Sequence, residues 1–319
     1  MGLLVSVNCI TYNHEKYIGD AIEGFLMQKT NFDFEILIGE DCSTDNTKTI
    51  CENYAKKAKG KIRLITSDNN VGARKNSERL LEHSRGKYIA LCEGDDFWTD
   101  PYKLQKQVDY MESHPECTLC FHAAKVVNEN GKKTGGLFRS YNENSISLTE
   151  EIITGGGEFC PTASLFFPKK YIENPPDFFQ KAHIGDYPLQ MLLASYGYAY
   201  YIDEIMSAYR IGVSGSWTNQ LHSGTNVIQK IIQAKKNDIS LLNGFNQFTK
   251  NKYINEVEKA KLKREFDILL IQNKIKEAKG TKYLIFYNSL SIKEKTKIYS
   301  RAYFPNLYAK MIKIKKAIM

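Results

Sequence analysis

Short apolar runs alternate with amphipathic segments along the first hundred residues. Four runs have the length and β-branched content of buried strands: Leu3–Cys9, Phe34–Ile38, Ile62–Ile65 and Tyr88–Cys92. Helical spacing of apolar residues predicts three helices between them: Tyr17–Met27, Thr44–Lys57 and Asn76–Ser84. This alternation predicts right-handed β-α-β units and an α/β fold with a mostly parallel sheet flanked by helices. Ligands bind such sheets beyond the carboxyl ends of the strands, so the residues after each run are the first candidates for a site.

The pattern becomes less regular after residue 100. It predicts a helix over Lys103–Ser113, a strand over Thr118–Val127, a turn at Asn130-Gly131 and a short helix at Thr149–Ile153. Residues 135–160 are glycine-rich and are otherwise predicted to be irregular. Further on it predicts a strand over Ala163–Phe167, a helix over Tyr187–Tyr196, and a strand pair or one bent strand over Tyr198–Arg210. From about residue 226 the pattern is helical and Lys-rich, so we expect an α/β domain over 1–222 and a helical region over 223–319.

The composition is that of a folded soluble protein. The 319 residues are 42% hydrophobic and 25% charged, which excludes a disordered, collagen-like or disulfide-stapled chain. Mean hydropathy is −0.42, and no apolar run reaches the roughly 18 to 20 residues of a membrane span. The first residues lack a basic segment and a cleavage site, so we expect no signal peptide. Seven cysteines without framework spacing predict reduced thiols and a cytoplasmic protein, and strand packing explains the single Cys117-x-x-Cys120 better than zinc.

The net charge of +8 is unevenly distributed. Residues 250–319 hold 18 Lys and Arg against 6 Asp and Glu, whereas residues 1–249 hold 26 against 30. Three interpretations fit the basic tail: a packed helical appendage, a helix that docks on anionic lipid, or nucleic-acid binding, for which the chain offers charge but no motif. The apolar and aromatic residues of this tail recur at helical spacing: Ile298, Tyr299, Ala302, Tyr303, Leu307, Tyr308, Met311, Ile312 and Ile314.

An acidic segment follows the fourth predicted strand. Glu93, Asp95 and Asp96 lie within four residues, directly before Phe97 and Trp98. Carboxylates this close repel one another, and Mg²⁺ or Mn²⁺ relieves that repulsion while also binding phosphate oxygens. The alternative is a solvated acidic loop, although such loops rarely run straight into two bulky aromatic residues.

A second acidic segment follows the second predicted strand. Asp41 could accept a hydrogen bond from a base N–H, such as N3 of uracil, or from a ribose hydroxyl. Capping of the next helix is the alternative role, but Ser43 and Thr44 suit it well, which leaves Asp41 free. Tyr12, after the first strand, offers a ring for a base to stack on, or is a half-buried core residue. The chain has neither G-x-G-x-x-G after its first strand nor a P-loop, so a dinucleotide site and a P-loop site are excluded.

Four segments together carry a resemblance to a known family. They are Val5-Ser-Val with Thr11-Tyr12-Asn13, Glu40–Thr47, Asn70-Val-Gly72 with Asn76, and Gly86–Leu91 with Glu93–Trp98. Their order and spacing resemble family 2 glycosyltransferases, which are inverting enzymes of the Rossmann-like GT-A fold. The resemblance is close over about residues 3–110 and loose over 160–215, and it implies a nucleotide-diphospho-sugar donor with Mn²⁺ or Mg²⁺ as cofactor.

The resemblance also implies roles for individual residues. The nucleoside would be held by the residues after the first strand, Thr11, Tyr12 and Asn13, together with Asp41. Ribose and metal would be bound by the family's D-x-D, here Glu93-Gly94-Asp95, in which Glu93 replaces the usual Asp. Arg74 and Asn76 lie where basic or amide side chains approach the nucleotide in the family.

The family's general base is an acid that opens a helix in an (E/G)D-x-x-L context. Gly185-Asp186-Tyr187-Pro188-Leu189 matches it, so the resemblance makes Asp186 the candidate base. A helix cap alone is the alternative, because Pro188 suits a first helical turn.

The acceptor side is less well defined. Cys160–Ser164 resembles the family's acceptor segment, and we expect Cys160, Thr162, Asp96 and Trp98 to shape the acceptor pocket, although a core position explains Trp98 equally well. Tyr209–Trp217 resembles a Y-R-x-H segment but has no His at 212 or 213, so Arg210, His222 or water would replace that group. A processive Q-x-x-R-W motif is absent, which favours transfer of a single sugar.

The sequence therefore predicts a metal-dependent inverting glycosyltransferase that uses a nucleotide-diphospho-sugar, UDP-linked in our interpretation. Its acceptor would be a saccharide or lipid-linked molecule in cell-surface polysaccharide assembly, reached from the cytoplasmic face of the membrane and without a nucleic-acid partner. Two alternatives remain: a nucleotidyltransferase, which should carry a Gly-rich basic loop where Ile10–Glu15 has no glycine, and a non-catalytic sugar- or membrane-binding module.

Overall fold

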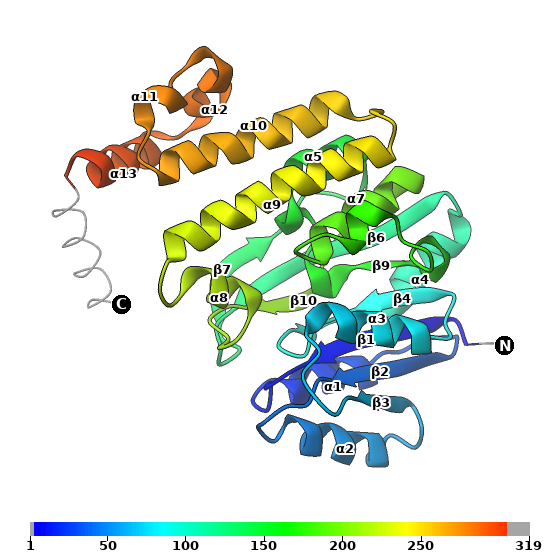
Figure 1. The fold of residues 1–319 in the computed structure, drawn as a ribbon. Coiled ribbons are helices and arrows are strands. Elements are labelled where there is room, and N and C mark those ends of the chain that lie inside the picture. The colour runs from blue at the N-terminus through cyan, green and yellow to red at the C-terminus, as the bar shows by residue number, and fades with distance from the viewer. Residues whose placement is uncertain (1–2, 305–319) are drawn as a thin grey trace. The chain divides into compact units, whose positions relative to one another are not determined.

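The structure is a computed structural model that describes residues 3–304. The chain divides into two compact units, Met1–Gln220 and Leu221–Met319, and each is described by itself. Figure 1 shows the strands gathered in the first unit and the long helices α9 and α10 in the second.

One sheet organises the first unit. Its ten strands are β1 (Val5–Thr11), β2 (Phe34–Glu40), β3 (Ile62–Thr66), β4 (Tyr88–Leu91), β5 (Phe97–Trp98), β6 (Cys117–Val127), β7 (Lys133–Phe138), β8 (Ser145–Ser147), β9 (Phe166–Pro168) and β10 (Tyr198–Arg210). The strand order is β3-β2-β1-β4-β9-β6-β10-β5, with β7 on β6 and β8 on β10. The α/β fold predicted from the sequence is confirmed.

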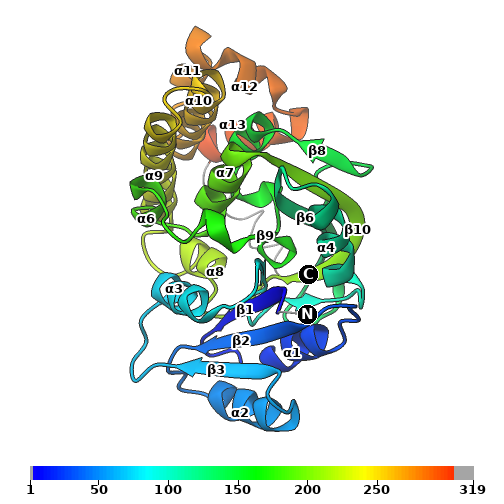
Figure 2. The same ribbon diagram turned by 90° about the vertical axis from the view of Figure 1, so that its right-hand side faces the viewer.

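The first half of the sheet, β3-β2-β1-β4, is parallel throughout. Its helices are α1 (Ile18–Leu26), α2 (Thr47–Lys57) and α3 (Ala73–His83). Val5, Val7 and Cys9 alternate toward α1 and form the hydrophobic core with it, whereas Asn8 faces the other way and accepts a hydrogen bond from Ser84 at the end of α3. Figure 2 shows α1 and α3 on opposite sides of β1, as right-handed crossovers to β2 on one side and β4 on the other require.

The second half of the sheet is mixed. β9 pairs antiparallel with both β4 and β6, and β10 is parallel to β6 but antiparallel to β5 and β8. β10 is one strand of 13 residues with register shifts around Ile205, which is the bent-strand alternative. The helices here are α4 (Lys103–Ser113), α5 (Thr149–Gly155), α6 (Asp177–Gln180), α7 (Asp186–Tyr196) and α8 (Trp217–His222).

Two expectations for this half were wrong. Residues 135–160 are not irregular outside the helix, because most of β7 and all of β8 lie there. The strand predicted over Ala163–Phe167 begins only at Phe166, since a 3-10 turn over Thr162–Ser164 precedes it. Short edge strands rich in Gly and Ser carry little apolar periodicity, so the sequence pattern did not show them.

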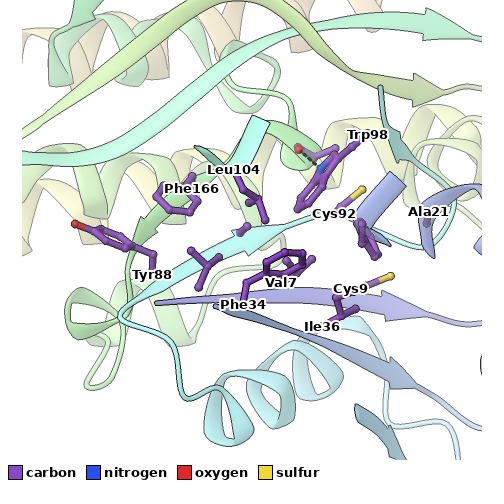
Figure 3. Packing of buried hydrophobic residues seen from close by; sticks show 14 of the residues in the cluster. Val7, Cys9, Ala21, Phe34, Ile36, Tyr88, Cys92, Trp98, Leu104 and Phe166 are labelled. Atoms are coloured by element: carbon purple, nitrogen blue, oxygen red, sulfur yellow. Dashed lines mark hydrogen bonds between the residues drawn. The ribbon is translucent and has the colours of Figure 1, made fainter. Parts of the chain in front are cut away.

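The core packs between the first half of the sheet and α1, α2 and α4. Figure 3 shows part of this core. Trp98 lies beside Cys92, and Leu104 lies above Val7 and Cys9. All seven cysteines are free, and Cys117 and Cys120 are buried in β6, as the strand-packing interpretation expects.

The second unit is helical. It contains α9 (Val227–Phe248), α10 (Ile254–Ile271), α11 (Ile275–Ala278), α12 (Leu284–Ser289) and α13 (Ile292–Tyr303). α9 and α10 form a hairpin with Leu242, Phe245 and Val257 fully buried. Within residues 3–304, no helix is both long and apolar enough to cross a membrane. Of the tail residues singled out above, Leu307, Tyr308, Met311, Ile312 and Ile314 lie outside the described residues.

Candidate active site

Three loops meet at the carboxyl end of β1. The backbone N–H of Asp41, after β2, donates to the carbonyl of Thr11 at 3.1 Å. On the other side, the N–H of Gly94, after β4, donates to the carbonyl of Ile10 at 2.9 Å. The end of β1 therefore lies between the Asp41 segment and the acidic Glu93 segment, at the edge of the sheet where ligands bind in this class of fold.

Gly94 is the residue that allows this close approach. A Cβ at position 94 would lie 2.6 Å from Oγ1 of Thr11 and 2.9 Å from Nδ1 of His14. Any side chain there would push the acidic loop away from β1. Thr11, 2% exposed, contacts His14 through its own hydroxyl at 3.2 Å. Thr11 therefore packs against the acidic loop that follows β4.

The loops after β1 and β2 form one hydrogen-bonded platform. The Asn13 side chain accepts from the N–H of Thr44 at 2.8 Å, and the Asn13 N–H donates to Oγ of Ser43 at 3.0 Å. His14 N–H donates to Oγ1 of Thr47 at 2.8 Å. Asn13 has a positive φ of 56°, a left-handed conformation that asparagine tolerates well. Asn13 thus holds the platform together.

Tyr12 differs from its neighbours because its ring is 41% exposed. It is the large aromatic side chain that the platform presents to solvent. This exposure argues against the alternative that Tyr12 is a half-buried core residue.

Asp41 is buried and strongly hydrogen-bonded. Its carboxylate accepts from the N–H of Val71 at 2.9 Å, the N–H of Gly72 at 2.8 Å and the hydroxyl of Ser67 at 3.1 Å. The partners of the Asp41 carboxylate lie in the loop before α3, where Gly72 adopts a positive φ of 85°, and not in α2, the helix for which a capping role was considered. This fixes both the carboxylate and the loop.

Arg74 and Asn76, on α3, are directed into the protein. The Asn76 amide, 1% exposed, donates to the carbonyl of Gly39 at 2.7 Å and accepts from Arg79 at 2.8 Å. The Arg74 guanidinium donates to three main-chain carbonyls of the segment 179–184. The partners of both side chains are protein groups, and for Asn76 this corrects the expectation of a nucleotide contact, because its amide is buried and its hydrogen bonds are used.

Glu93 lies in a crowded cluster of acidic side chains. Burial and the negative charges of Asp95 and Asp186 raise the pKa of Glu93 to about 8. The Coulomb effect falls with distance, so Asp186 must lie near Glu93 and Asp95 to contribute to this pKa shift. Asp186 comes from a segment more than 90 residues away in the chain. Tyr209 and Cys160 border the cluster, since its carboxylates also raise the pKa of the Tyr209 hydroxyl and of the Cys160 thiol, after burial.

Asp186 begins helix α7, as the sequence pattern predicts. Its Oδ1 accepts from the N–H of Tyr187 at 2.8 Å, and the carboxylate lies at the positive end of the helix dipole. Gly157 borders it closely: a Cβ there would lie 3.6 Å from Asp186 Oδ2.

Arg210, at the end of β10, holds the acidic loop. Its side chain donates to the carbonyl of Asp95 at 2.8 Å, to the carbonyl of Glu129 at 3.0 Å and to the carboxylate of Asp20 at 2.8 Å, and its N–H donates to Asp96 Oδ1 at 2.7 Å. The guanidinium also packs over the rings of Tyr17 and Phe97. Each guanidinium nitrogen thus has a protein partner, so Arg210 holds the acidic loop by hydrogen bonds within the protein. His222 belongs to the second unit.

Most of the expected acceptor residues are buried. Trp98 is 2% exposed, packs edge-on against Phe25 at 4.8 Å between ring centroids, and donates from Nε1 to the carbonyl of Ala163 at 2.9 Å. Of the two positions considered for Trp98, the acceptor pocket and the core, its burial supports the core. Cys160 is fully buried and Asp96 is 2% exposed, whereas Thr162 is half-buried at the start of the 3-10 turn.

The donor set fits a divalent cation that is completed by phosphate oxygens. Among residues 3–304, no group of three or more His, Cys, Asp and Glu side chains is arranged to hold a metal by itself. Mg²⁺ and Mn²⁺ usually take only one or two protein carboxylates beside substrate phosphates and water. Asp95, 8% exposed, and Glu93, whose pKa is raised by burial and by its acidic neighbours, supply such a pair.

Comparison with known proteins places the chain in a family. Residues 6–172, more than half of the chain, match the family described as Glycosyl transferase family 2. The chain belongs to this family. The matched part includes the segments that carry Asp41, Glu93 and Asp95, whereas Asp186 lies beyond it.

Individual relatives cover the same region. An uncharacterised protein of Mycobacterium tuberculosis is 46% identical over 129 residues, which are 40% of this chain and 37% of that protein. TuaG of Bacillus subtilis, named for teichuronic acid biosynthesis, is 33% identical over 128 residues, 40% of this chain and 49% of TuaG. The match thus spans less than half the length of these curated relatives.

Solved structures extend the likeness of fold to nearly the whole chain. Staphylococcus aureus TarS 1–349 in complex with UDP-GlcNAc matches with a TM-score of 0.57 and 16% identity, over 94% of this chain and 79% of TarS 1–349. The mannosyltransferase PcManGT of Pyrobaculum calidifontis, in complex with GDP-Man and Mn²⁺, matches with a TM-score of 0.57 and 12% identity. The match covers 96% of this chain and 82% of PcManGT. At these identities the likeness shows the GT-A fold.

Sequence reasoning missed several residues of the site. Ser43 was given only a capping role, and Thr47, the first residue of α2, and the loop anchor Ser67 were not considered, because short polar side chains at helix starts and in loops give no distinctive signal. The Asp20 partner of Arg210 lies on α1, 190 residues away, so spacing gave no signal for it.

Proposed function

We propose that this protein is a metal-dependent inverting glycosyltransferase. It transfers one sugar from a nucleotide-diphospho-sugar to a hydroxyl of a saccharide or lipid-linked acceptor in cell-surface polysaccharide assembly. The observation that carries the proposal is the convergence at the end of β1: the platform with the exposed Tyr12 on one side and the carboxylates of Glu93, Asp95 and Asp186 on the other. Family membership supports the same conclusion.

The platform would bind the nucleoside. Tyr12 offers an exposed ring for the base to stack on, and Asp41 Oδ2 accepts one hydrogen bond from the protein, which leaves capacity for a base N–H or a ribose hydroxyl. We propose UDP as the nucleotide because uracil N3–H matches a carboxylate acceptor. TarS was solved with UDP-GlcNAc and PcManGT with GDP-Man, so both classes of donor enter the test.

Asp186 would act as the general base. Inversion by direct displacement requires one group that takes the proton from the acceptor hydroxyl as its oxygen attacks the anomeric carbon. Asp186 is the first residue of α7, and its carboxylate accepts from the N–H of Tyr187 at 2.8 Å.

Glu93 and Asp95 would hold the divalent cation together with the donor diphosphate. When bound, the cation neutralises the charge of the leaving nucleoside diphosphate. The chain's own part is to keep these two carboxylates in place, which Gly94 and Arg210 do through the contacts described above.

Donor binding can be tested by thermal unfolding with UDP-, GDP-, CMP- and dTDP-sugars, each with and without Mn²⁺. A ligand that binds only the native state stabilises it in proportion to the logarithm of its excess over the Kd. We expect a UDP-sugar with Mn²⁺ to raise the Tm, and Asp95→Asn to remove the effect of Mn²⁺. Stabilisation by GDP-sugars alone would correct the nucleotide, and no response to any donor would contradict the proposed function.

We further propose that the second unit brings the enzyme to an anionic membrane surface. In α12, α13 and the residue after α13, four large apolar side chains are more exposed than buried: Ile285, Ile292, Tyr303 and Phe304. Lys293 and Lys297 are exposed on the same helix as Ile292. Apolar side chains among lysines are typical of a helix that lies in the lipid interface.

The membrane proposal predicts binding to anionic vesicles that weakens at high salt. The test is co-sedimentation with phosphatidylglycerol vesicles at low and high salt, using the full chain and the variant Ile292→Ser/Phe304→Ser. We expect the variant to bind several-fold less. Equal binding of both proteins, or binding to neither charged nor neutral vesicles, would contradict the proposal.

A further inference from the structure

Arg74 makes contacts that a donor-binding residue would not need. Its Nη1 donates to the carbonyl of Phe179 at 3.2 Å, and its Nη2 donates to the carbonyls of Ala182 at 2.6 Å and Ile184 at 3.2 Å. The guanidinium also lies 5.9 Å from the centroid of the Phe179 ring. These contacts link α3 to a segment more than 100 residues away in the chain.

The segment that Arg74 holds leads directly into the candidate base. Ile184 precedes Asp186 by two residues, and only Gly185 stands between them. Gly185 is exposed, and a Cβ there would meet nothing within 4 Å, so packing against Gly185 does not fix the start of α7. The carbonyls that Arg74 binds are thus an anchor immediately before Asp186.

The other end of the Arg74 contact is rigid. The N–H groups of Val71 and Gly72 are bound by the buried carboxylate of Asp41, and Asn76 N–H donates to the carbonyl of Gly72 at 3.0 Å in the first turn of α3. Arg74 stands in that same turn. A continuous series of hydrogen bonds therefore runs from the nucleoside platform, through α3, to the segment before Asp186.

Guanidinium chemistry suits this task. The three carbonyls lie in the last turn of the short helix α6 and in the residues that follow it, and the planar fork of arginine can bind all three at once. The Phe179 carbonyl also accepts from the N–H of Ala182 at 3.2 Å. A lysine ammonium keeps the charge but cannot reach the same set of carbonyls with fixed geometry.

We infer that Arg74 is a positioning residue for Asp186: it holds the segment 179–184, and with it the N-terminus of α7, in register with the nucleoside platform. The inference rests on the proposed function, in which Asp186 is the base. It assigns to Arg74 a role other than contact with the donor.

The test compares Arg74→Ala and Arg74→Lys with Lys75→Ala, which removes an exposed positive charge from the next position of the same helix. Three quantities are measured: the Kd of a UDP-sugar with Mn²⁺, the kcat of transfer, and the rate of tryptic cleavage after Lys181. We expect both Arg74 variants to lower kcat by about 10- to 100-fold, since small misplacement of a reacting group has effects of this size. Donor Kd should change by less than about threefold, and cleavage after the exposed Lys181 should accelerate. Lys75→Ala should resemble the wild type in all three.

A double variant separates positioning from general damage. If Arg74 acts through the base, Arg74→Ala should add almost nothing to the loss already caused by Asp186→Asn, because groups that act as a unit are not additive. Full additivity would overturn the inference. So would a large rise in donor Kd with unchanged cleavage after Lys181, which would make Arg74 a donor ligand, or an unchanged kcat in both Arg74 variants.

The inference and the proposed function fail in different ways. If the wild type transfers sugar and Asp186→Asn does not, but Arg74→Ala behaves as the wild type, only the role of Arg74 is wrong. If the wild type neither binds nor turns over any nucleotide-sugar, the proposed function fails, and the role of Arg74 as a positioning residue for catalysis fails with it.

Discussion

The two halves of the sheet prepare their loops in opposite ways. On the parallel half, the polar groups at the strand ends bond to one another: Asp41 to its loop, Asn13 to Thr44, and Asn76 to Gly39. At the boundary with the mixed half, Glu93, Asp95 and Asp186 repel one another and raise the pKa of Glu93. One half is stable as it stands, whereas the other holds charges that a cation and a substrate would balance. Removing the Asp41 carboxylate should therefore lower the free energy of unfolding, whereas removing a carboxylate of the acidic cluster should not.

The largest effect is expected for the base on the charged side. Asp186→Asn keeps the size and the hydrogen bond to Tyr187 N–H but removes the proton acceptor. We expect kcat to fall by about 10³-fold, within the range known for general bases. The Tm and the donor Kd should stay close to those of the wild type. Normal turnover in a discontinuous transfer assay would show that Asp186 is not the base.

The second effect should appear on the parallel half as lost stability. Asp41→Ala leaves the N–H groups of Val71 and Gly72 without their acceptor, whereas the hydroxyl of Ser67 keeps the carbonyl of Asn69 at 2.8 Å. An unsatisfied buried group costs about 1 to 3 kcal/mol, and because Val71 and Gly72 are half-buried we expect a loss near the lower end of that range in the free energy of unfolding. Urea unfolding measures this loss, and donor binding should weaken in parallel. A variant as stable as the wild type would break the contrast between the two halves.

The third prediction concerns pH and the core under the mixed half. Lys103 is fully buried, contacts Gln107 at 2.7 Å and lies over the Trp98 ring, and burial lowers the pKa of its ammonium to about 7. Between about pH 7 and pH 10 the unfolded chain keeps a proton that the native protein has released, so this group makes the free energy of unfolding rise with pH, by up to about 1.4 kcal/mol per pH unit.

Lys103→Met removes that titration. Urea unfolding of both proteins at pH 7, 8 and 9 should show the stability of the variant relative to the wild type decreasing as pH rises. The comparison between the two proteins cancels the other titrating groups. Parallel curves would mean that Lys103 is not held neutral in the native protein.

The smallest effect has the opposite sign to that of Asp41→Ala. Burial and the charges of Asp95 and Asp186 raise the pKa of Glu93, so at pH 7 the unfolded wild type releases a proton that the native cluster retains, which lowers the free energy of unfolding. Glu93→Gln has no such proton, so the metal-free protein should gain about 1 kcal/mol of stability at pH 7, the scale of a shift of one pKa unit. Chemical unfolding in EDTA measures the gain. The same variant should respond less to Mn²⁺ with a UDP-sugar. A loss of stability in EDTA would show that the acidic cluster is already balanced without a cation.

The fold could be predicted from the sequence because its signals are local and periodic. Strands such as Phe34–Glu40 are short apolar runs, and helix α4 (Lys103–Ser113) lies where the spacing predicts it. The edge strands β7 and β8 were missed because Gly and Ser positions carry no apolar alternation. Their pairing with β6 and β10 depends on partners that are distant in the chain.

The site could be predicted only in outline. Spacing after each strand located Asp41, Glu93 and Asp95, because the topology of a parallel sheet brings strand ends together. The direction of each side chain could not be read from spacing. Asn76 and Trp98 lie in the right segments but face the protein interior, and Arg74 and Arg210 find their partners more than 100 residues away.

The position of Trp98 has a practical consequence for fluorescence. The chain has two tryptophans, of which Trp98 is 2% exposed in the core and Trp217 is 52% exposed after β10. Emission from Trp98 should be blue-shifted and inaccessible to acrylamide until the first unit unfolds, whereas Trp217 should be quenched in the native protein. Each indole is thus a separate optical reporter, one for the core and one for the segment that follows the last strand.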